Sequence, residues 1–387
     1  MQGSEARQVA RDRATRAHPA LIGLSHWIHD HPELGYAEEM ASAWVADWLE
    51  KAGFEVERNL GGLPTAVAGS YGRGPLHVAL LAEYDALPEV GHACGHNVIA
   101  ATALGAAVAL AGVAEQVGIR VSVIGTPAEE GGGGKIRLLE AGAFEGVHVA
   151  LMTHPGPADV LEPVILAAET LDVTYRGRTA HASSFPERGI NAADALVVAQ
   201  VSIGLLRQRL LASDRVHGLV TRGGEAVNVI PEQAQAQLMI RAASRDRLDE
   251  LRAEVGRCLE AGALATGATL DVHSQPAYRE MRHNMHLADL YQLHAESLGR
   301  SFERDGRLVF SHFSSDIGNV SQVIPSIHPI IGIDAGDAVN HQPEFAAAAA
   351  SPSADQAILD GATALAWTAI DAALTGELRD RLLAGGE

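Results

Sequence analysis

The chain has 387 residues, of which 47% are hydrophobic and 20% charged, a balance typical of a globular protein rather than a disordered one. Its 48 acidic and 29 basic residues give a formal charge of −19, which excludes nucleic acids and anionic membrane surfaces as general partners. A chain of this length exceeds one ordinary hydrophobic core, so two domains are expected.

The cysteine content and the apolar stretches indicate a cytoplasmic protein. The two cysteines, Cys94 and Cys258, lie far apart and form no disulfide framework, which fits a reducing compartment. Residues 1–16 are polar and contain no apolar core of the kind a signal peptide needs. The uncharged stretch 98–114 is mostly alanine and glycine, so we expect a buried helix there rather than a membrane span.

The first part of the chain predicts alternating strands and helices. Apolar residues recur at three- and four-residue steps over 20–51 and are interrupted at 31–35, which predicts two helices joined by a turn. Four apolar runs, predicted as strands, then alternate with two helical stretches; the runs are 65–68, 77–82, 120–126 and 147–153, and the helices 98–117 and 134–141. Such alternation predicts a doubly wound, mainly parallel sheet, which binds its ligands at the carboxyl ends of the strands.

A different order follows in the middle of the chain. Strands are predicted at 169–176, 216–222, 233–242 and 269–274, with helices at 190–211 and 246–265. This βαββαβ order is that of a ferredoxin-like domain. Helices and short strands then resume, so we predict an α/β catalytic domain of residues 1–166 and 277–387, with an inserted ferredoxin-like domain of residues 167–276.

Residues that bind metals occur at four predicted strand ends or turns. The segments 83–88, 126–131 and 154–157 each follow a predicted strand, and 91–97 opens a predicted helix. Thiolate, imidazole and carboxylate are the ligand types of zinc and neighbouring metals. Cys94 and His96 flank a glycine and can point into one site. In the adjacent pair Glu129 and Glu130, one carboxylate can coordinate while the other faces the reacting water.

At these residues the chain resembles the aminoacylase/carboxypeptidase-G superfamily of two-metal peptidases. Within it, the chain is similar to the subgroup of hippurate hydrolase, auxin-conjugate hydrolases and p-aminobenzoyl-glutamate hydrolase. The resemblance runs from about residue 29 to residue 345. Its motifs are Asp-Ala-Leu-Pro at 85–88, His-Ala-Cys-Gly-His at 92–96, Pro-Ala-Glu-Glu-Gly at 127–131 and Gly-Arg-Thr-Ala-His-Ala at 177–182.

The resemblance implies two divalent metal ions per subunit, zinc or manganese, with cobalt as a further candidate. Cys94 stands where related branches have a bridging aspartate, which implies that it contacts both ions. The residues that match the family's metal ligands are Cys94, His96, Glu130, His154 and His341.

The resemblance also implies residues that act beside the metals. Glu129 matches the general base for a metal-bridging water, and Asp85 matches a carboxylate that orients a metal ligand. His181 matches a histidine of the inserted domain that enters the partner subunit's site in a homodimer and stabilises the oxyanion. Asn228 and Arg241 match substrate-binding positions, the arginine gripping a carboxylate.

Three segments depart from the commoner pattern of hippurate hydrolases. Glu83-Tyr84 replaces Asp-Met, Asn97 replaces an aspartate, and residues 314–321 replace a Glu-Asp-Phe segment. These departures resemble the p-aminobenzoyl-glutamate hydrolase and aminoacylase-1-like branch. His312 and Asp316 lie in a polar segment between a predicted helix and strand, and we expect them to line the substrate pocket.

We therefore predict a metal-dependent amidohydrolase that cleaves an N-acyl amino acid, a dipeptide or an amino-acid conjugate. Its partners are expected to be a small amide substrate bearing a carboxylate and a second copy of the chain, or several in a larger homo-oligomer. One alternative is a hydrolytic deaminase of an aromatic amine on the same metals, which would release ammonia. The other is a non-catalytic binding protein, which would be expected to have lost at least one ligand or the base.

Overall fold

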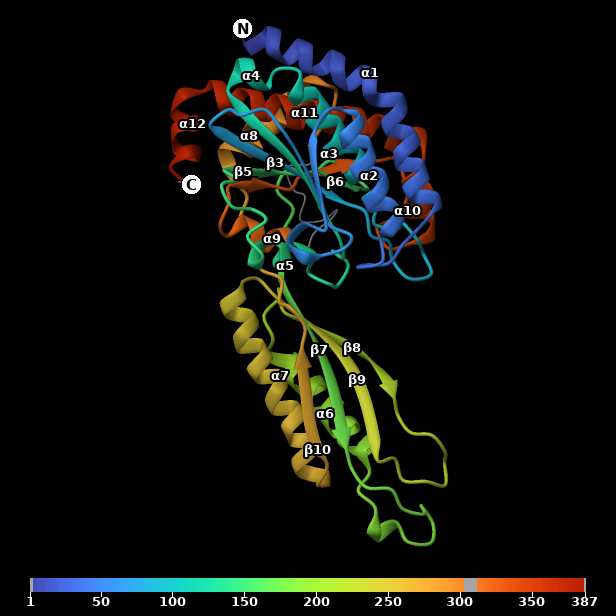
Figure 1. Ribbon diagram of the computed structural model, residues 1–387. Helices are drawn as coiled ribbons and strands as arrows, with labels where there is room; N and C mark the ends of the chain where they lie inside the picture. The colour runs from blue at the N-terminus through green and yellow to red at the C-terminus, as the bar shows by residue number, and fades with distance from the viewer. Residues whose placement is uncertain (1–2, 303–311, 386–387) are drawn as a thin grey trace. The chain divides into compact units, whose positions relative to one another are not determined.

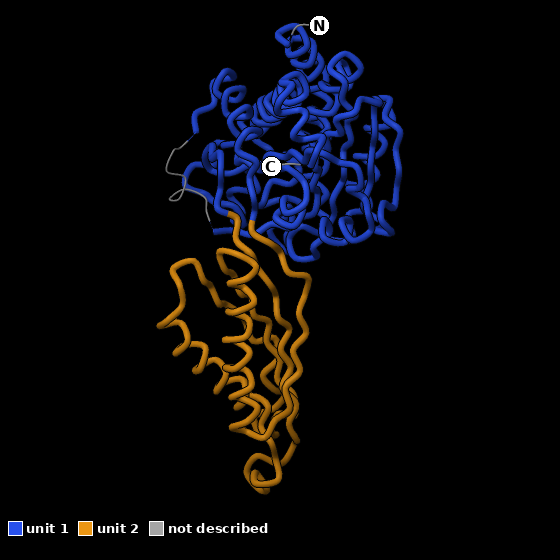
Figure 2. The backbone as a smooth tube through the Cα atoms, turned by 90° about the vertical axis from the view of Figure 1, so that its left-hand side faces the viewer, with its two compact units in different colours: residues 1–164, 281–387 blue, residues 165–280 orange. Residues whose placement is uncertain are grey.

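The computed structural model describes residues 3–302 and 312–385 and divides the chain into two compact units (Figure 2). Unit 1 comprises residues 1–164 and 281–387, and unit 2 comprises residues 165–280. These dividing points differ by a few residues from the boundaries expected from the sequence. The chain leaves unit 1 once and returns to it, so unit 2 is an insertion.

Unit 1 contains a mainly parallel sheet, as predicted (Figure 1). The strand order is β1-β2-β4-β3-β5-β11, and the pairs β4–β3, β3–β5 and β5–β11 are parallel. Strand β1 was not predicted; it and β2 form the antiparallel edge. The strand bounds are β1 Glu55–Arg58, β2 Val67–Tyr71, β3 Leu76–Glu83, β4 Ile119–Thr126, β5 Val149–Leu151 and β11 Ser326–Ile327. A second sheet pairs β6 (His154–Gly156) with β12 (Ile330–Gly332).

Helices cover both faces of the sheet, since alternate residues of β3 enter different clusters. Val78, Leu80 and Ala82 pack with residues of α1, α3 and α11, whereas Ala79 and Leu81 pack with residues of α5 and α9. The helix bounds are α1 Gly3–Asp30, α2 Glu39–Lys51, α3 His96–Ala111, α4 Ala114–Val117, α5 Gly134–Glu140, α8 Met285–Ser297, α9 Ile317–Ser321, α10 Pro343–Ala348, α11 Pro352–Leu374 and α12 Gly376–Leu383.

Two long helices of unit 1, α1 and α11, were not expected from the sequence in the form that the structure has. Helix α1 begins at Gly3, well before the predicted start at residue 20. Its first turns bury Ala6, Ala10 and Ala14, and the prediction missed them because alanines do not stand out as an apolar pattern in the sequence. Helix α11 is long and apolar enough to cross a membrane by length and composition, but 78% of its most apolar window is buried inside the protein.

Unit 2 contains the predicted βαββαβ elements. Its sheet has the order β10-β7-β9-β8 with antiparallel neighbours throughout. Burial alternates strictly along β9, which places every second residue under the helices. The bounds are β7 Ala167–Arg176, α6 Ala192–Leu206, β8 Arg215–Arg222, β9 Gln233–Ala242, α7 Arg245–Thr266 and β10 Thr269–Ser274. The predicted fold class is therefore confirmed for both units.

Candidate metal centre

The five predicted ligands of unit 1 converge. Cys94 Sγ lies 3.4 Å from His154 Nε2. Glu130 Oε1 lies 3.8 Å from His96 Nε2 and 3.6 Å from His341 Nε2. One ligand atom each from Cys94, His96 and His154 lie within 4.8 Å of one another, and the same holds for Cys94, Glu130 and His341. Cys94 belongs to both groups, the position expected for a ligand shared by two ions.

The backbone around Cys94 turns sharply enough to aim its neighbours inward. Gly95 has φ 81°, and a Cβ there would clash with Pro155 Cγ, so only glycine fits between Cys94 and His96. The His341 amide donates to the carbonyl of Ala93 at 2.8 Å, which ties the loop that carries His341 to the same turn. His341 is the exposed member of the set, with 57% of its side chain accessible, so the site opens on that side.

Asp85 contacts two of the predicted ligands. Its Oδ1 lies 3.0 Å from His96 Nδ1, and its Oδ2 accepts the backbone N–H of Glu130 at 3.0 Å. Burial opposes the charge on Asp85, but His96, the Glu130 amide and Lys135 outweigh it and lower the pKa of Asp85. Asp85 and Cys94 also raise the pKa of His96 against the effect of burial, so the metal-free site favours a protonated ring. Because Asp85 holds the Nδ1 proton, Nε2 is the atom that would bind a metal ion in place of its own proton.

The chemistry of these donors fits a pair of divalent cations. Burial raises the pKa of Cys94, Glu129 and Glu130, so the protein by itself disfavours their charged forms. His96 Nε2 and Glu130 Oε1 are buried without a hydrogen-bond partner among the described residues. Two ligand atoms at about 2.1 Å from a tetrahedral ion lie about 3.4 Å apart. Within each ligand group the separations are close to this value, at 3.4 Å between Cys94 Sγ and His154 Nε2 and 3.6 Å between Glu130 Oε1 and His341 Nε2.

Glu129 lies beside the ligands without belonging to either group that contains Cys94. Its Oε2 is 3.8 Å from His96 Nε2, and the residue is buried. This position suits a general base that would take a proton from the attacking water if ions were bound. The preceding residue, Ala128, has φ 56°, a strained conformation for a residue with a side chain, at the turn that presents both glutamates.

In unit 2 the structure brings His181 and Asn228 together and places Arg241 elsewhere. The amide of Ala182 donates to the carbonyl of Asn228 at 3.0 Å, and both His181 and Asn228 are exposed. His181 Nδ1 accepts the amides of Ser183 and Ser184 at 3.3 and 3.1 Å, so its proton sits on the outward Nε2. Arg241 lies at the opposite end of β9 from the loop that carries Asn228.

The two predicted pocket residues near α9 differ in accessibility. His312 is exposed, and its amide donates to the carbonyl of Val164 at 2.9 Å. Asp316 is fully buried, and its carboxylate binds Lys135 through both oxygens, at 2.7 Å to Nζ and 2.8 Å to the amide N. We expected Asp316 to contact substrate. The structure corrects this expectation, because the carboxylate is buried and paired with Lys135. Lys135 itself was missed from the sequence, because a lysine in a glycine-rich turn carries no sign that it will be buried.

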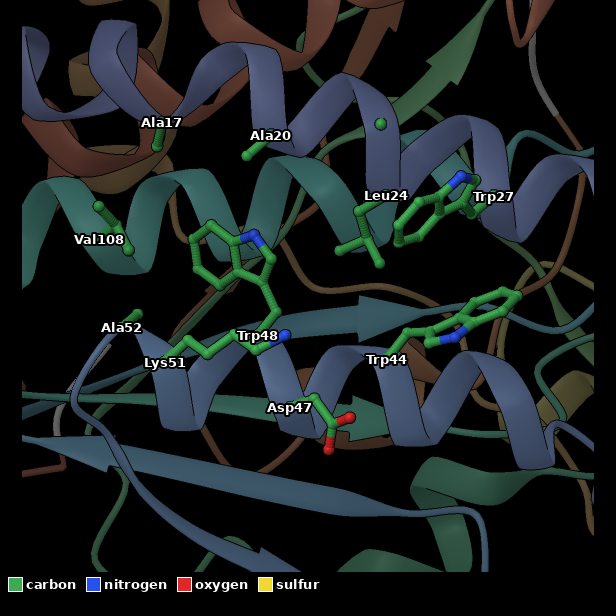
Figure 3. Close-up of a pocket in the computed structure, with 11 residues that line it drawn as sticks. Ala17, Ala20, Leu24, Trp27, Trp44, Asp47, Trp48, Lys51, Ala52 and Val108 are labelled. Atoms are coloured by element: carbon green, nitrogen blue, oxygen red, sulfur yellow. The ribbon is translucent and has the colours of Figure 1, made fainter.

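A large apolar groove lies away from the metal ligands (Figure 3). It has a volume of about 590 Å³ and lies between α1 and α2, where Trp27, Trp44 and Trp48 line it. Its lining contains none of the predicted metal-binding or catalytic residues among those that the structure describes. Among the described residues, Asp47 and Lys51 are its only charged lining residues, so this part of the chain offers no set of metal ligands there.

We expect Cys94→Ser to lose most of its bound metal, because a neutral hydroxyl does not replace a thiolate that both ligand groups share. Elemental analysis after dialysis measures this loss. Cys258→Ser is the matched control, since Cys258 is the other free cysteine and lies in α7 of unit 2. Equal metal content in the Cys94 variant and the control would remove Cys94 from the site.

The chain is similar in sequence to known peptidases and hydrolases. A family model described as a peptidase dimerisation domain matches residues 168–266. The chain is 40% identical over 379 residues to an Xaa-Arg dipeptidase of Mus musculus, covering 94% of this chain and 88% of that protein. It is 34% identical to one of the subunits of p-aminobenzoyl-glutamate hydrolase from Escherichia coli (strain K12), over 64% of this chain and 56% of that protein.

Solved structures share the fold. A dinuclear metal-binding peptidase of the M20 family from Bacillus subtilis aligns with a TM-score of 0.70 and 22% identity, covering 93% of this chain and 99% of that one. An aminobenzoyl-glutamate utilization protein from Klebsiella pneumoniae aligns with a TM-score of 0.74 and 19% identity, covering 96% of this chain and 98% of that one.

Proposed function

The chain belongs to the M20 peptidase family, and from that premise we propose that it is a metal-dependent dipeptidase that prefers a C-terminal arginine. The resemblance found in the sequence is thereby confirmed. Two relatives named Xaa-Arg dipeptidase, from Mus musculus and Homo sapiens, support the substrate class at 40% and 37% identity. The formal charge of −19 favours the approach of a cationic substrate.

The observation that carries this proposal is the convergence of the ligand groups next to a buried glutamate. Cys94, His96, Glu130, His154 and His341 would hold two ions. When bound, these ions would polarise the scissile carbonyl and make water a stronger acid. Glu129 would take a proton from the attacking water as the O–C bond forms and deliver it to the leaving nitrogen as the C–N bond breaks.

We propose zinc as the native metal, with manganese as the second candidate. A thiolate is a soft ligand and favours zinc over harder cations, although imidazole and carboxylate serve both metals. Because such a thiolate must stay reduced, we also propose a cytoplasmic location; both cysteines are unpaired in the structure.

We propose that the working unit is a homodimer in which His181 serves the partner's site. From Gln233, near the loop of His181, β9 runs eight residues to Arg241, which is roughly 26 Å at about 3.3 Å per residue. A dipeptide spans at most about 7 Å, so His181 and Arg241 of one copy cannot hold the same substrate. If Arg241 grips the substrate carboxylate and the outward Nε2–H of His181 donates to the oxyanion, the two must come from different copies.

Mixing two inactive variants tests this exchange. Homodimers of His181→Ala and of Glu129→Gln should each be nearly inactive, whereas a mixed dimer retains one site with an intact base and an intact histidine. We expect co-expression of the two variants to recover about a quarter of wild-type activity by random pairing. Activity no higher than that of the separate variants would show that His181 acts within its own chain or not at all.

The substrate proposal is tested with the zinc-loaded protein and a panel of amides. The panel contains Xaa-Arg and Xaa-Glu dipeptides, N-acetyl-arginine and p-aminobenzoyl-glutamate, with released amine and ammonia measured separately. We expect the highest kcat/KM for the Xaa-Arg dipeptides. Preference for p-aminobenzoyl-glutamate would overturn the substrate class, and release of ammonia alone would favour a deaminase.

A further inference from the structure

A fully buried cluster of three charged residues lies next to the candidate metal centre in unit 1. Lys135 Nζ lies 2.5 Å from Glu83 Oε1 and 2.7 Å from Asp316 Oδ1, and all three side chains are inaccessible to solvent. Two carboxylates against one ammonium leave the cluster with one negative charge in excess. Burying charges is costly unless each is compensated, so the surplus charge requires a further partner.

We assign the surplus negative charge to a carboxylate oxygen of Glu83 that faces the metal ligands. Glu83 Oε2 is buried and has no hydrogen-bond partner among the residues that the structure describes. It lies 3.5 Å from His96 Nε2, which is also buried and unpartnered within the described residues. Since Asp85 occupies Nδ1 of His96, Nε2 is the ring atom that faces Glu83. A carboxylate oxygen and a ring nitrogen that face each other in a buried site need a metal ion or a proton between them.

The distance favours a metal ion over a proton. An N–H···O hydrogen bond has a donor–acceptor distance of about 2.7–3.2 Å. Two ligand atoms on one tetrahedral ion are instead about 3.4 Å apart. The observed 3.5 Å matches the second arrangement. Glu83, His96 and Glu129 also form a third group whose ligand atoms lie within 4.8 Å of one another.

We propose that Glu83 is a sixth protein ligand of the metal centre, bound to the same ion as His96, and that Lys135 and Asp316 are positioning residues for its carboxylate. This inference rests on the proposed function, because it presupposes the two ions. Lys135 fixes Oε1 and leaves Oε2 to face the site. The turn before Lys135 is tightly packed, since a Cβ on Gly134 would clash with the carbonyl of Pro127.

Glu83→Gln tests the proposal, because the amide keeps the size of the side chain and removes its charge. We expect one of the two ions to bind roughly 10- to 100-fold more weakly in chelator competition, while the other is unchanged. The visible spectrum of the Co²⁺-loaded variant should also change. Glu83→Asp, which restores the charge on a shorter side chain, should recover part of the affinity.

The matched control is Asp371→Asn in the same unit. Asp371 belongs to another charge cluster, with Arg7 at 2.6 Å and His294 at 3.0 Å, and touches none of the metal ligands among the described residues. We expect it to lower stability with and without metal but to leave both metal affinities unchanged.

Two outcomes separate this inference from the proposed function. Wild-type affinities and Co²⁺ spectrum in Glu83→Gln, with only the metal-free protein destabilised, would make Glu83 a structural ion-pair partner and overturn the inference alone. Failure of the wild-type chain itself to bind stoichiometric metal would overturn both.

Discussion

Glu129→Gln is expected to retain both metal ions and to lose roughly 10²-fold or more in kcat, because removing a general base typically costs that much. Glu129 is buried, with its Oε2 3.8 Å from His96 Nε2, and it belongs to neither ligand group that shares Cys94. The amide preserves the shape of the side chain but cannot accept the proton of the attacking water. Turnover on an Xaa-Arg dipeptide, measured with metal content on the same sample, tests this expectation.

The adjacent glutamate provides the matched control. Glu130 Oε1 lies among His96, His341 and Cys94, so we expect Glu130→Gln to lose metal and activity together. The two variants should therefore differ: Glu129→Gln should lose turnover and keep its metal, whereas Glu130→Gln should lose both. Wild-type turnover in Glu129→Gln, or metal loss confined to Glu129→Gln, would contradict the assigned roles.

Lys135→Met should destabilise unit 1 by about 3–5 kcal/mol, the usual cost of removing one partner from a buried ion pair. Methionine fills similar space but leaves the carboxylates of Glu83 and Asp316 buried without their ammonium. Asp316 already has a pKa raised to about 6, mainly by burial and despite Lys135, so loss of the lysine should raise it further. Denaturant unfolding of the chelated protein, where no metal ion can compensate, measures the change.

Lys51→Met is the control for this substitution. Lys51 is exposed in the last turn of α2 and makes no ion pair in the described structure, so its loss should change the free energy of unfolding by at most about 0.5 kcal/mol. Equal stability of the two variants would mean that the charge cluster contributes nothing to the fold.

The elements of unit 2 could be predicted closely because their sequence patterns are strong. The apolar alternation over 233–242 and the helical spacing over 246–265 each bury one face, and the structure has β9 over Gln233–Ala242 and α7 over Arg245–Thr266. The start of α1 could not be predicted in this way, since a stripe of alanines is too weakly apolar to show a period. Strand β1 has only one partly buried residue, so no run of apolar residues marks it in the sequence.

The site, too, has a part that the sequence predicts and a part that it does not. The ligand segments could be placed together because carboxyl ends of parallel strands share one edge of a sheet. Pairing of Lys135 with Asp316 joins residues 181 positions apart, and no local pattern predicts such a contact. Glu83 and the segment containing Asp316 both depart from the commoner family pattern, but that pattern also has acids in both segments. These departures therefore gave no sign of a shared partner, which the structure shows to be Lys135.

The central claim is that five side chains from separated segments hold two metal ions in unit 1, and elemental analysis of the wild-type protein tests it most directly. The protein is stripped with a chelator, reloaded in turn with zinc, manganese or cobalt, and freed of excess ion before measurement. We expect two ions per chain with at least one of these metals. Less than one ion per chain with all three would contradict the claim.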